Sequence, residues 1–286
     1  MARLIFTTTV AWEETHDFGC ASLGLAGKCD NDHSMSASWP IVLDGTTLTG
    51  TYDQVRDGIV NFGKKSLAAI ILFGNAGGEN QFLDSVRQYL PCPVVGGGAA
   101  IDSATNQVAL ITGRGEVAVF LITDERFSYS AETKCIHDQI LEKCTLELDD
   151  PRTIRTINGM DPVNFLAQKK RTLGIPESDF EHLTLSDERN VNAHLSLAGG
   201  KIVSGRDLQE NMILRYVPHD SVYDTMFSFY NDPSAIIFGC AGLSGLLDRP
   251  LSTDSLGLFL FGEVCTVDGF AEFGNLMLSK LRICKK

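Results

Sequence analysis

A carboxylate stands at a chemically suggestive position in residues 259–275, which read FLFGEVCTVDGFAEFGN. Glu263 follows a short apolar run and Gly262, so we expect it at a strand end that faces a crevice. There it could accept a charge-assisted hydrogen bond from a cationic group of a ligand; Gly262 and Asn275 are further predicted ligand contacts. Glu263→Gln is then expected to weaken ligand binding about tenfold to a hundredfold and to leave stability nearly unchanged. The alternative is a capping or solvated acid.

Two clusters of glycines follow apolar runs further upstream, GNAGG at residues 74–78 and GGG at residues 96–98. Glycine lets a ligand approach the backbone closely, and the N–H groups that it exposes can hold an anion. Neither cluster fits G-x-G-x-x-G or G-x-x-x-x-G-K-[ST], so the patterns argue against a nucleotide site. The alternative is a tight turn without a ligand. The predicted ligand contacts in these clusters are Gly74, Asn75, Gly77, Gly96 and Gly97.

Cys240 ends an apolar run in FGCAGLSG, residues 238–245. As a nucleophile it would need a nearby base or a helix N-terminus to form a thiolate. No histidine is close in sequence, although His194 or His219 could be close in space. The sequence favours a buried structural cysteine, so no catalytic residue is assigned. Cys240 and Gly242 are predicted ligand contacts, and a cysteine-dependent enzyme using Cys240 is an alternative function.

Two groups of residues have side chains that bind metals. The first could form a tetrahedral zinc site and comprises His16, Cys20, Cys29 and His33. Its spacing is not that of a C-x2-C knuckle, so we predict a metal-free protein without a cofactor. The second group is Cys135, His137 and Cys144, which fall on a predicted helix and its end. Residues two apart on a helix do not share a face, so this group is interpreted as incidental.

Hydrophobic periodicity predicts an α/β fold with mixed sheets. Continuous apolar runs predict strands buried on both faces at residues 67–73, 234–238 and 256–261. Other strands are expected at residues 3–10, 94–95, 108–111, 116–122, 152–157, 183–185, 191–197, 201–203, 211–217 and 276–283. Helices are expected at residues 52–63, 79–90, 131–143, 161–173 and 220–230.

Short matches recur at a constant offset along the chain. The tripeptide AII at residues 69–71 is repeated at residues 235–237, an offset of 166 (69 to 235). Gly96 and Gly262 share that offset, and so do Asp102 and Asp268. With a slip of one residue, FGNAG at 73–77 also matches FGCAG at 238–242. The ordered set predicts two related α/β halves that arose by internal duplication.

The second half resembles the C-terminal module of the FIST family (F-box and intracellular signal transduction). That module typically has a strand ending in F-x-C-x-G-R-G, then G-E-I, then a closing strand opened by Asn. The corresponding segments here are INGMDP at 157–162, NMILRYVPHD at 211–220, FGCAGLSG at 238–245, FGEV at 261–264 and Asn275. Leu243 stands where the family usually has Arg, which would remove an anion-binding contact.

The resemblance implies an N-terminal module over residues 1–125 and a C-terminal module over residues 126–286. In the first, VVGGGAA at 94–100 replaces the usual vvGcst-g. FIST proteins are regarded as intracellular sensory modules that bind small molecules such as amino acids. No F-box-like segment precedes Arg3, so ubiquitin-ligase adaptor work is not expected. The resemblance thus implies a small-molecule ligand and a protein signalling partner, without catalysis; a protein-interaction scaffold is another alternative.

Composition narrows the choice of partners and compartment. The chain has 286 residues and a net charge of −12, so neither nucleic acid nor an anionic membrane surface is an expected partner. The longest apolar run falls far short of the ~20 residues that span a bilayer. The N-terminus, MARLIFTTTVAWEE, does not look like a signal peptide. We therefore expect a cytoplasmic protein whose eight cysteines are thiols.

Overall fold

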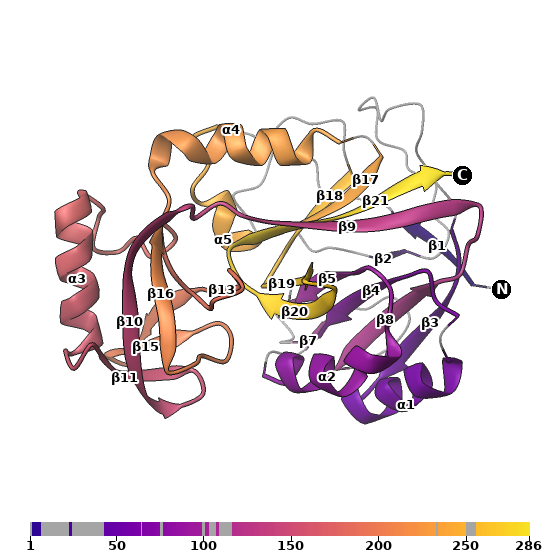
Figure 1. Ribbon diagram of the computed structural model, residues 1–286, viewed down its shortest axis with the longest axis horizontal. Coiled ribbons are helices and arrows are strands. Elements are labelled where there is room, and N and C mark those ends of the chain that lie inside the picture. Colours follow the sequence, from indigo (N-terminus) through magenta and orange to yellow (C-terminus); the bar gives the residue numbers. More distant parts are fainter. Residues whose placement is uncertain are drawn as a thin grey trace.

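The computed structural model describes residues 2–6, 23–24, 43–63, 65–74, 77–98, 101–102, 107–108, 116–232, 234–249 and 256–286. Its helices and mixed sheets belong to the α/β class, as the sequence predicts (Figure 1). In those ranges, no helix is both long and apolar enough to cross a membrane.

The largest sheet has eight strands and forms the lower sheet of Figure 1. The strand at residues 68–73 is parallel to its neighbour at residues 94–98 and antiparallel to its neighbour at residues 117–122. The order is β2 (Leu23–Gly24), β1 (Ala2–Phe6), β3 (Leu43–Gly50), β8 (Val117–Ile122), β4 (Ala68–Phe73), β5 (Val94–Gly98), β19 (Glu263–Val267) and β20 (Phe270–Gly274). Both β4 and β8 are buried along their whole length, which explains their continuous apolar sequences.

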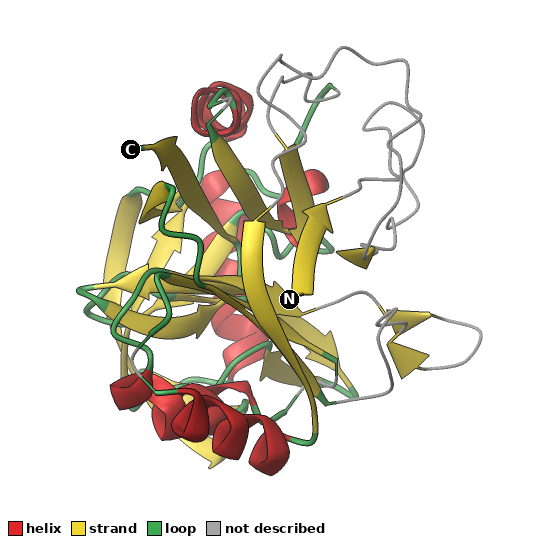
Figure 2. Cartoon of the chain, turned by 90° about the vertical axis from the view of Figure 1, so that its right-hand side faces the viewer, coloured by secondary structure: helices red, strands yellow, loops and turns green. Residues whose placement is uncertain are grey.

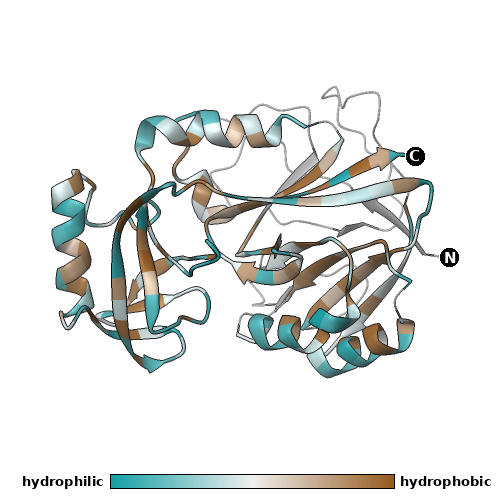
Figure 3. Ribbon diagram, in the orientation of Figure 1, coloured by the Kyte–Doolittle hydropathy of each residue, from teal (hydrophilic) through white to brown (hydrophobic). Residues whose placement is uncertain are grey.

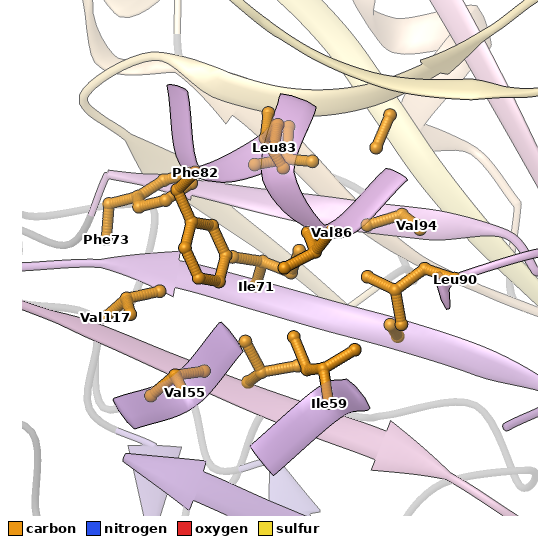
Figure 4. Close-up of a cluster of buried hydrophobic side chains, with 14 of the residues drawn as sticks. Val55, Ile59, Ile71, Phe73, Phe82, Leu83, Val86, Leu90, Val94 and Val117 are labelled. Carbon is orange, nitrogen blue, oxygen red and sulfur yellow. The ribbon is translucent and has the colours of Figure 1, made fainter. Parts of the chain in front are cut away.

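Two helices cover the outer face of this sheet, α1 (Tyr52–Phe62) and α2 (Glu79–Val86), the latter followed by the 3-10 turn η1 (Arg87–Tyr89). Thr51 and Gln54 form a capping box at the start of α1. The buried helical side chains pack on the sheet residues Ile71 and Phe73 (Figure 4). They are Val55, Ile59, Phe82, Leu83 and Val86.

A second sheet stacks on the opposite face of the first. Its order is β18 (Leu256–Leu260), β17 (Ala235–Cys240), β21 (Met277–Lys285) and β9 (Phe127–Cys135). Side chains such as Ile70 and Phe120 from the first sheet meet Phe238 and Leu281 from the second. The helix α4 (His219–Tyr230) covers the outer face of the second sheet. The layers are therefore helix, sheet, sheet, helix (Figures 1 and 2).

A third sheet, at the left of Figure 1, has its own apolar core under α3 (Pro162–Leu173). Asp161 caps α3 and Pro162 occupies its first turn, as predicted. The order is β13 (Asn192–Ala193), β12 (Leu183–Ser186), β16 (Asn211–Tyr216), β10 (Gln139–Asp150), β11 (Thr153–Ile157), β15 (Lys201–Ser204) and β14 (Leu195–Ala198). The remaining elements are β6 (Ile101–Asp102), β7 (Gln107–Val108) and the single turn α5 (Ala241–Ser244).

The helix predicted at residues 131–143 is wrong, because this region forms β9 and the start of β10. Burial along β9 alternates residue by residue, which is the period of a strand and not of a helix. All nine of its residues pair with β21. Figure 3 shows the alternation in β9 only weakly, since few of its inward side chains are strongly apolar. Tyr129 and Ala131 contribute to the core from inward positions.

The two stacked sheets repeat one pattern of strand directions. In β3-β8-β4-β5 and in β9-β21-β17-β18, the successive pairings are antiparallel, antiparallel and parallel. However, Gly96 lies inside β5, whereas Gly262 lies between β18 and β19. Gly96 and Gly262 therefore do not occupy equivalent positions. Instead Gly97 is the cross-strand partner of Glu263, because β19 adds to the edge of the first sheet beside β5.

Candidate functional site

Glu263, the first residue of β19, is completely buried. The expectation that it faces a crevice is therefore wrong. Its Oε2 accepts a hydrogen bond from the backbone N–H of Met277 at 3.3 Å, and Oε1 has no hydrogen-bond partner among the described residues. Burial raises the pKa of this carboxyl well above its usual value. Burial thus favours the neutral, protonated form of Glu263, which is a poor counter-charge for a cationic ligand.

Cys240 lies beside Glu263 and is also buried. Burial, reinforced by the nearby Glu263, raises the pKa of its thiol. Neither histidine proposed as a base is recruited to it: His194 lies 3.9 Å from Glu181 Oε1, and His219 packs edge-on against His182. Since a nucleophilic cysteine needs a lowered pKa and access, this arrangement does not activate Cys240.

Close packing explains three of the glycines that were predicted to contact a ligand. A Cβ on Gly96 would lie 1.9 Å from the Ile71 carbonyl oxygen, and one on Gly97 would lie 2.1 Å from that of Gly262. A Cβ on Gly242 would lie 2.8 Å from the Leu276 side chain. These three glycines therefore let neighbouring segments pack together.

The other predicted contacts divide between two places. The N–H of Gly74 donates to the Glu116 carbonyl, and that of Gly77 donates to the Glu79 carboxylate, so both donors are used within the chain. Asn75 lies outside the described residues. Asn275 lies near Gly262, and its Oδ1 accepts from the N–H of His194 at 3.3 Å. The structure therefore gathers Gly97, Cys240, Gly242, Gly262, Glu263 and Asn275 around the corner between β18 and β19, and places Gly74 and Gly77 elsewhere.

Of the two groups of candidate metal ligands, only the second lies within the described residues. The histidines and cysteines between residues 16 and 33 lie outside the described residues. Within the part of the chain that the structure describes, no three His, Cys, Asp or Glu side chains are grouped so that they could hold a metal. Cys135 and His137 lie close together at the end of β9, whereas Cys144 is buried in the core of the third sheet.

A cavity of about 600 Å³ opens where the end of β9, the β19–β20 hairpin and the loop after β12 meet β16. Its walls are mostly polar and carry charges of both signs. The lining residues are Thr133, Lys134, Cys135, His137, Asp138, Arg189, Asn190, Arg215, Thr266, Val267, Asp268 and Met277. None of these residues was among the ligand contacts predicted from the sequence. One feature of the sequence does indicate a functional residue here, because Arg215 is a charged residue inside the apolar strand NMILRYV.

Arg215 reaches the cavity from β16 and is only 8% exposed. Its Nε donates to Ser186 Oγ at 2.7 Å, and its Nη1 donates to the His137 carbonyl at 3.3 Å. Its Nη2 donates to Asn190 Oδ1. These three contacts fix the plane of the guanidinium at the cavity wall.

The loop after β12 is held by a buried ion pair beneath it. Asp187 and Arg206 are both buried, with Oδ2 and Nη2 3.4 Å apart. The second oxygen of Asp187 accepts from the N–H groups of Arg189 and Val191. This closes a turn in which Asn190 has a left-handed φ of 63°. The cavity wall is therefore rigidly built, because its turn is tied to a buried charge pair.

His137 and Cys135 are uncharged parts of the same wall. His137 Nε2 donates to the Glu181 carbonyl at 2.7 Å, which leaves Nδ1 to face the Asn192 amide at 3.4 Å. Burial lowers the pKa of His137 to about 4, so the ring is neutral at neutral pH. Burial also raises the pKa of the Cys135 thiol, which receives a hydrogen bond from Asn192 Nδ2.

The cavity and the buried carboxyl share a wall. Met277 lines the cavity, and its backbone N–H donates to Glu263. Glu263 therefore lies behind the cavity and not in it.

No protein-family model matches the chain, and no curated protein matches it.

Proposed function

We propose that this protein is an intracellular small-molecule-binding sensory protein of the FIST type, and that its ligand occupies the cavity between β9, β16 and the β19–β20 hairpin. The supporting observation is the cavity itself, whose volume of about 600 Å³ falls within the range of small-molecule sites. Polar groups converge on it from four separate segments of the chain. Amino acids and related metabolites are the ligands to test first.

Signalling without catalysis is favoured over a cysteine-dependent enzyme. Cys240 is buried beside a neutral carboxyl, and the thiol that does reach the cavity, Cys135, has a raised pKa. At both residues burial disfavours the charged thiolate, so neither is an activated nucleophile. The protein would therefore transmit ligand occupancy to a protein partner through its conformation or stability.

We also propose that the two stacked sheets arose by duplication of one α/β unit. The support is the shared pattern of strand directions together with the AII repeats, which fall in the equivalent strands β4 and β17. On this proposal, the β19–β20 hairpin of the second copy has been recruited to the edge of the first sheet. That recruitment builds one side of the cavity.

The experiment is a thermal-shift screen of amino acids and small metabolites, followed by thiol alkylation with each stabilising compound. Mass spectrometry reports each cysteine separately. A ligand in the cavity is expected to slow modification of Cys135 and to leave the exposed Cys284 unchanged as an internal control. The proposal fails if no compound protects Cys135. Modification of Cys240 in the folded protein would instead favour the cysteine-dependent enzyme.

A further inference from the structure

Buried cationic side chains differ in how the fold compensates their charge. Among the described residues, four lysines and arginines are buried: Lys170, Arg206, Arg215 and Lys280. Arg206 pairs with Asp187, and Lys280 pairs with Glu132 and Asp232. Lys170 lies 3.3 Å from the centroid of the Phe180 ring and donates to a backbone carbonyl. Within that set, only Arg215 has neither a carboxylate within 4.0 Å nor an aromatic ring beneath it.

An uncompensated buried guanidinium is costly, because its charge has lost most of its hydration. The acceptors that Arg215 contacts are a hydroxyl, a backbone carbonyl and an amide oxygen, all neutral. A guanidinium has five N–H donors, and these contacts use three of them. The charge and two donors of Arg215 remain available at the wall of an open cavity.

The charges around Arg215 do not replace the missing anion. Asp138 and Asp268 also line the cavity, but both are exposed and neither forms an ion pair with Arg215. Arg189 is already bound to Glu272, with Nη1 and Oε1 2.6 Å apart. The exposed Lys134 adds a second positive charge to the rim. The buried, unpaired charge at the cavity wall is therefore positive, although the protein as a whole has a net charge of −12.

We infer that the cavity binds an oxyanion, a carboxylate or phosphate group of a small molecule, and that Arg215 is its counter-charge. This inference rests on the proposed function, since it names the class of ligand for the same cavity. A planar guanidinium with two remaining donors matches the two oxygens of a carboxylate or of a phosphate. The three contacts that hold Arg215 prepare it for such a ligand, which lowers the ordering cost of binding.

The test compares probes that differ in charge but little in shape. Alkylation of Cys135 is followed with propionate, propionamide or inorganic phosphate present, at constant ionic strength adjusted with sodium chloride. Propionate or phosphate should protect Cys135 about tenfold better than propionamide at equal concentration. The difference in protection between propionate and phosphate then shows which oxyanion the cavity prefers. Cys284 reports any general effect of the salts on thiol reactivity.

Variants identify the residue that supplies the charge. Arg215→Gln should reduce protection by propionate or phosphate about tenfold or more, and Arg215→Lys should restore part of it. Because Arg215 also holds the cavity wall, replacing it can disturb the fold. A second variant therefore changes Lys134, an exposed residue at the rim of the cavity. Lys134→Glu should reduce protection about threefold to tenfold. Lys285→Glu is its matched control, since Lys285 is an exposed lysine at the other end of the β9–β21 pair, and should change protection less than about twofold.

The outcomes separate this inference from the proposed function. Protection by neutral compounds alone, or equal protection of a folded Arg215→Gln protein, would overturn the oxyanion inference and leave a ligand cavity standing. Protection by no compound of any charge would overturn both. Equal effects of Lys134→Glu and Lys285→Glu would also count against the inference, because the rim charge would then have no local role.

Discussion

Glu263 shows how burial changes the meaning of a residue that the sequence marks as functional. Its carboxyl lies behind the cavity and is fully buried, and one of its oxygens lacks a hydrogen bond within the part of the chain that the structure describes. Its pKa in the folded protein is raised above that of the unfolded chain, which is about 4.3. The folded state therefore gains from proton binding at Glu263. That stabilisation is fully present below about pH 4 and is lost as pH rises toward the folded pKa.

Glu263→Gln is consequently expected to stabilise the protein at neutral pH, contrary to the nearly unchanged stability expected for an exposed carboxylate. A neutral amide avoids the cost of holding a buried acid that tends to ionise. The gain should be roughly 1–3 kcal/mol at pH 8 and should vanish near pH 4. Urea denaturation at several pH values measures the difference.

Glu272 provides the matched control, because it is a second buried glutamate in the same hairpin. It forms ion pairs with Arg87 at 3.0 Å and Arg189 at 2.6 Å. Glu272→Gln should therefore destabilise the protein at neutral pH, by about 1–3 kcal/mol. If Glu263→Gln also destabilised the protein at pH 8, the assignment of Glu263 as a neutral buried acid would be refuted.

At the scale of elements, the β5–β19 pair depends on glycine. Gly97 has φ of 153° and faces the Gly262 carbonyl so closely that no side chain fits between the strands. Gly97→Ala is expected to cost more than about 3 kcal/mol, because the strands must separate. Thermal or urea unfolding, monitored by circular dichroism, measures the loss in free energy of unfolding.

Gly174 is the control for backbone strain alone. It ends α3 with φ of 71°, and a Cβ there would meet nothing within 4 Å. Gly174→Ala should cost only about 1–2 kcal/mol. Equal losses for the two variants would mean that the β5–β19 contact is not the reason for glycine at position 97.

Elements with strong local signals were predictable from the sequence. Apolar runs identified β4 and β17, and Asp161 with Pro162 marked the start of α3. The region of β9 was misread as a helix, because its inward residues include threonine and cysteine, which blur the alternation. The β19–β20 hairpin was also missed, although Asp268-Gly269 is a two-residue turn with positive φ at both residues.

At the scale of the whole molecule, the cavity could not be predicted from spacing. Its walls come from β9, the loop after β12, β16 and the β19–β20 hairpin, which meet only when all three of the larger sheets come together. Cys135 and His137 were set aside because a helix would have placed them on different faces. In the structure both line the cavity. The glycine cluster at residues 96–98, in contrast, is explained by close backbone packing.

The most direct test is a crystal structure of the protein with the compound that best protects Cys135. The compound should lie in the cavity beside Met277, with an oxygen about 3 Å from an Nη atom of Arg215. Glu263 should remain behind the wall and out of contact with it. A compound bound elsewhere would refute the cavity as the ligand site, and a compound bound in the cavity with no oxygen near Arg215 would refute the oxyanion site.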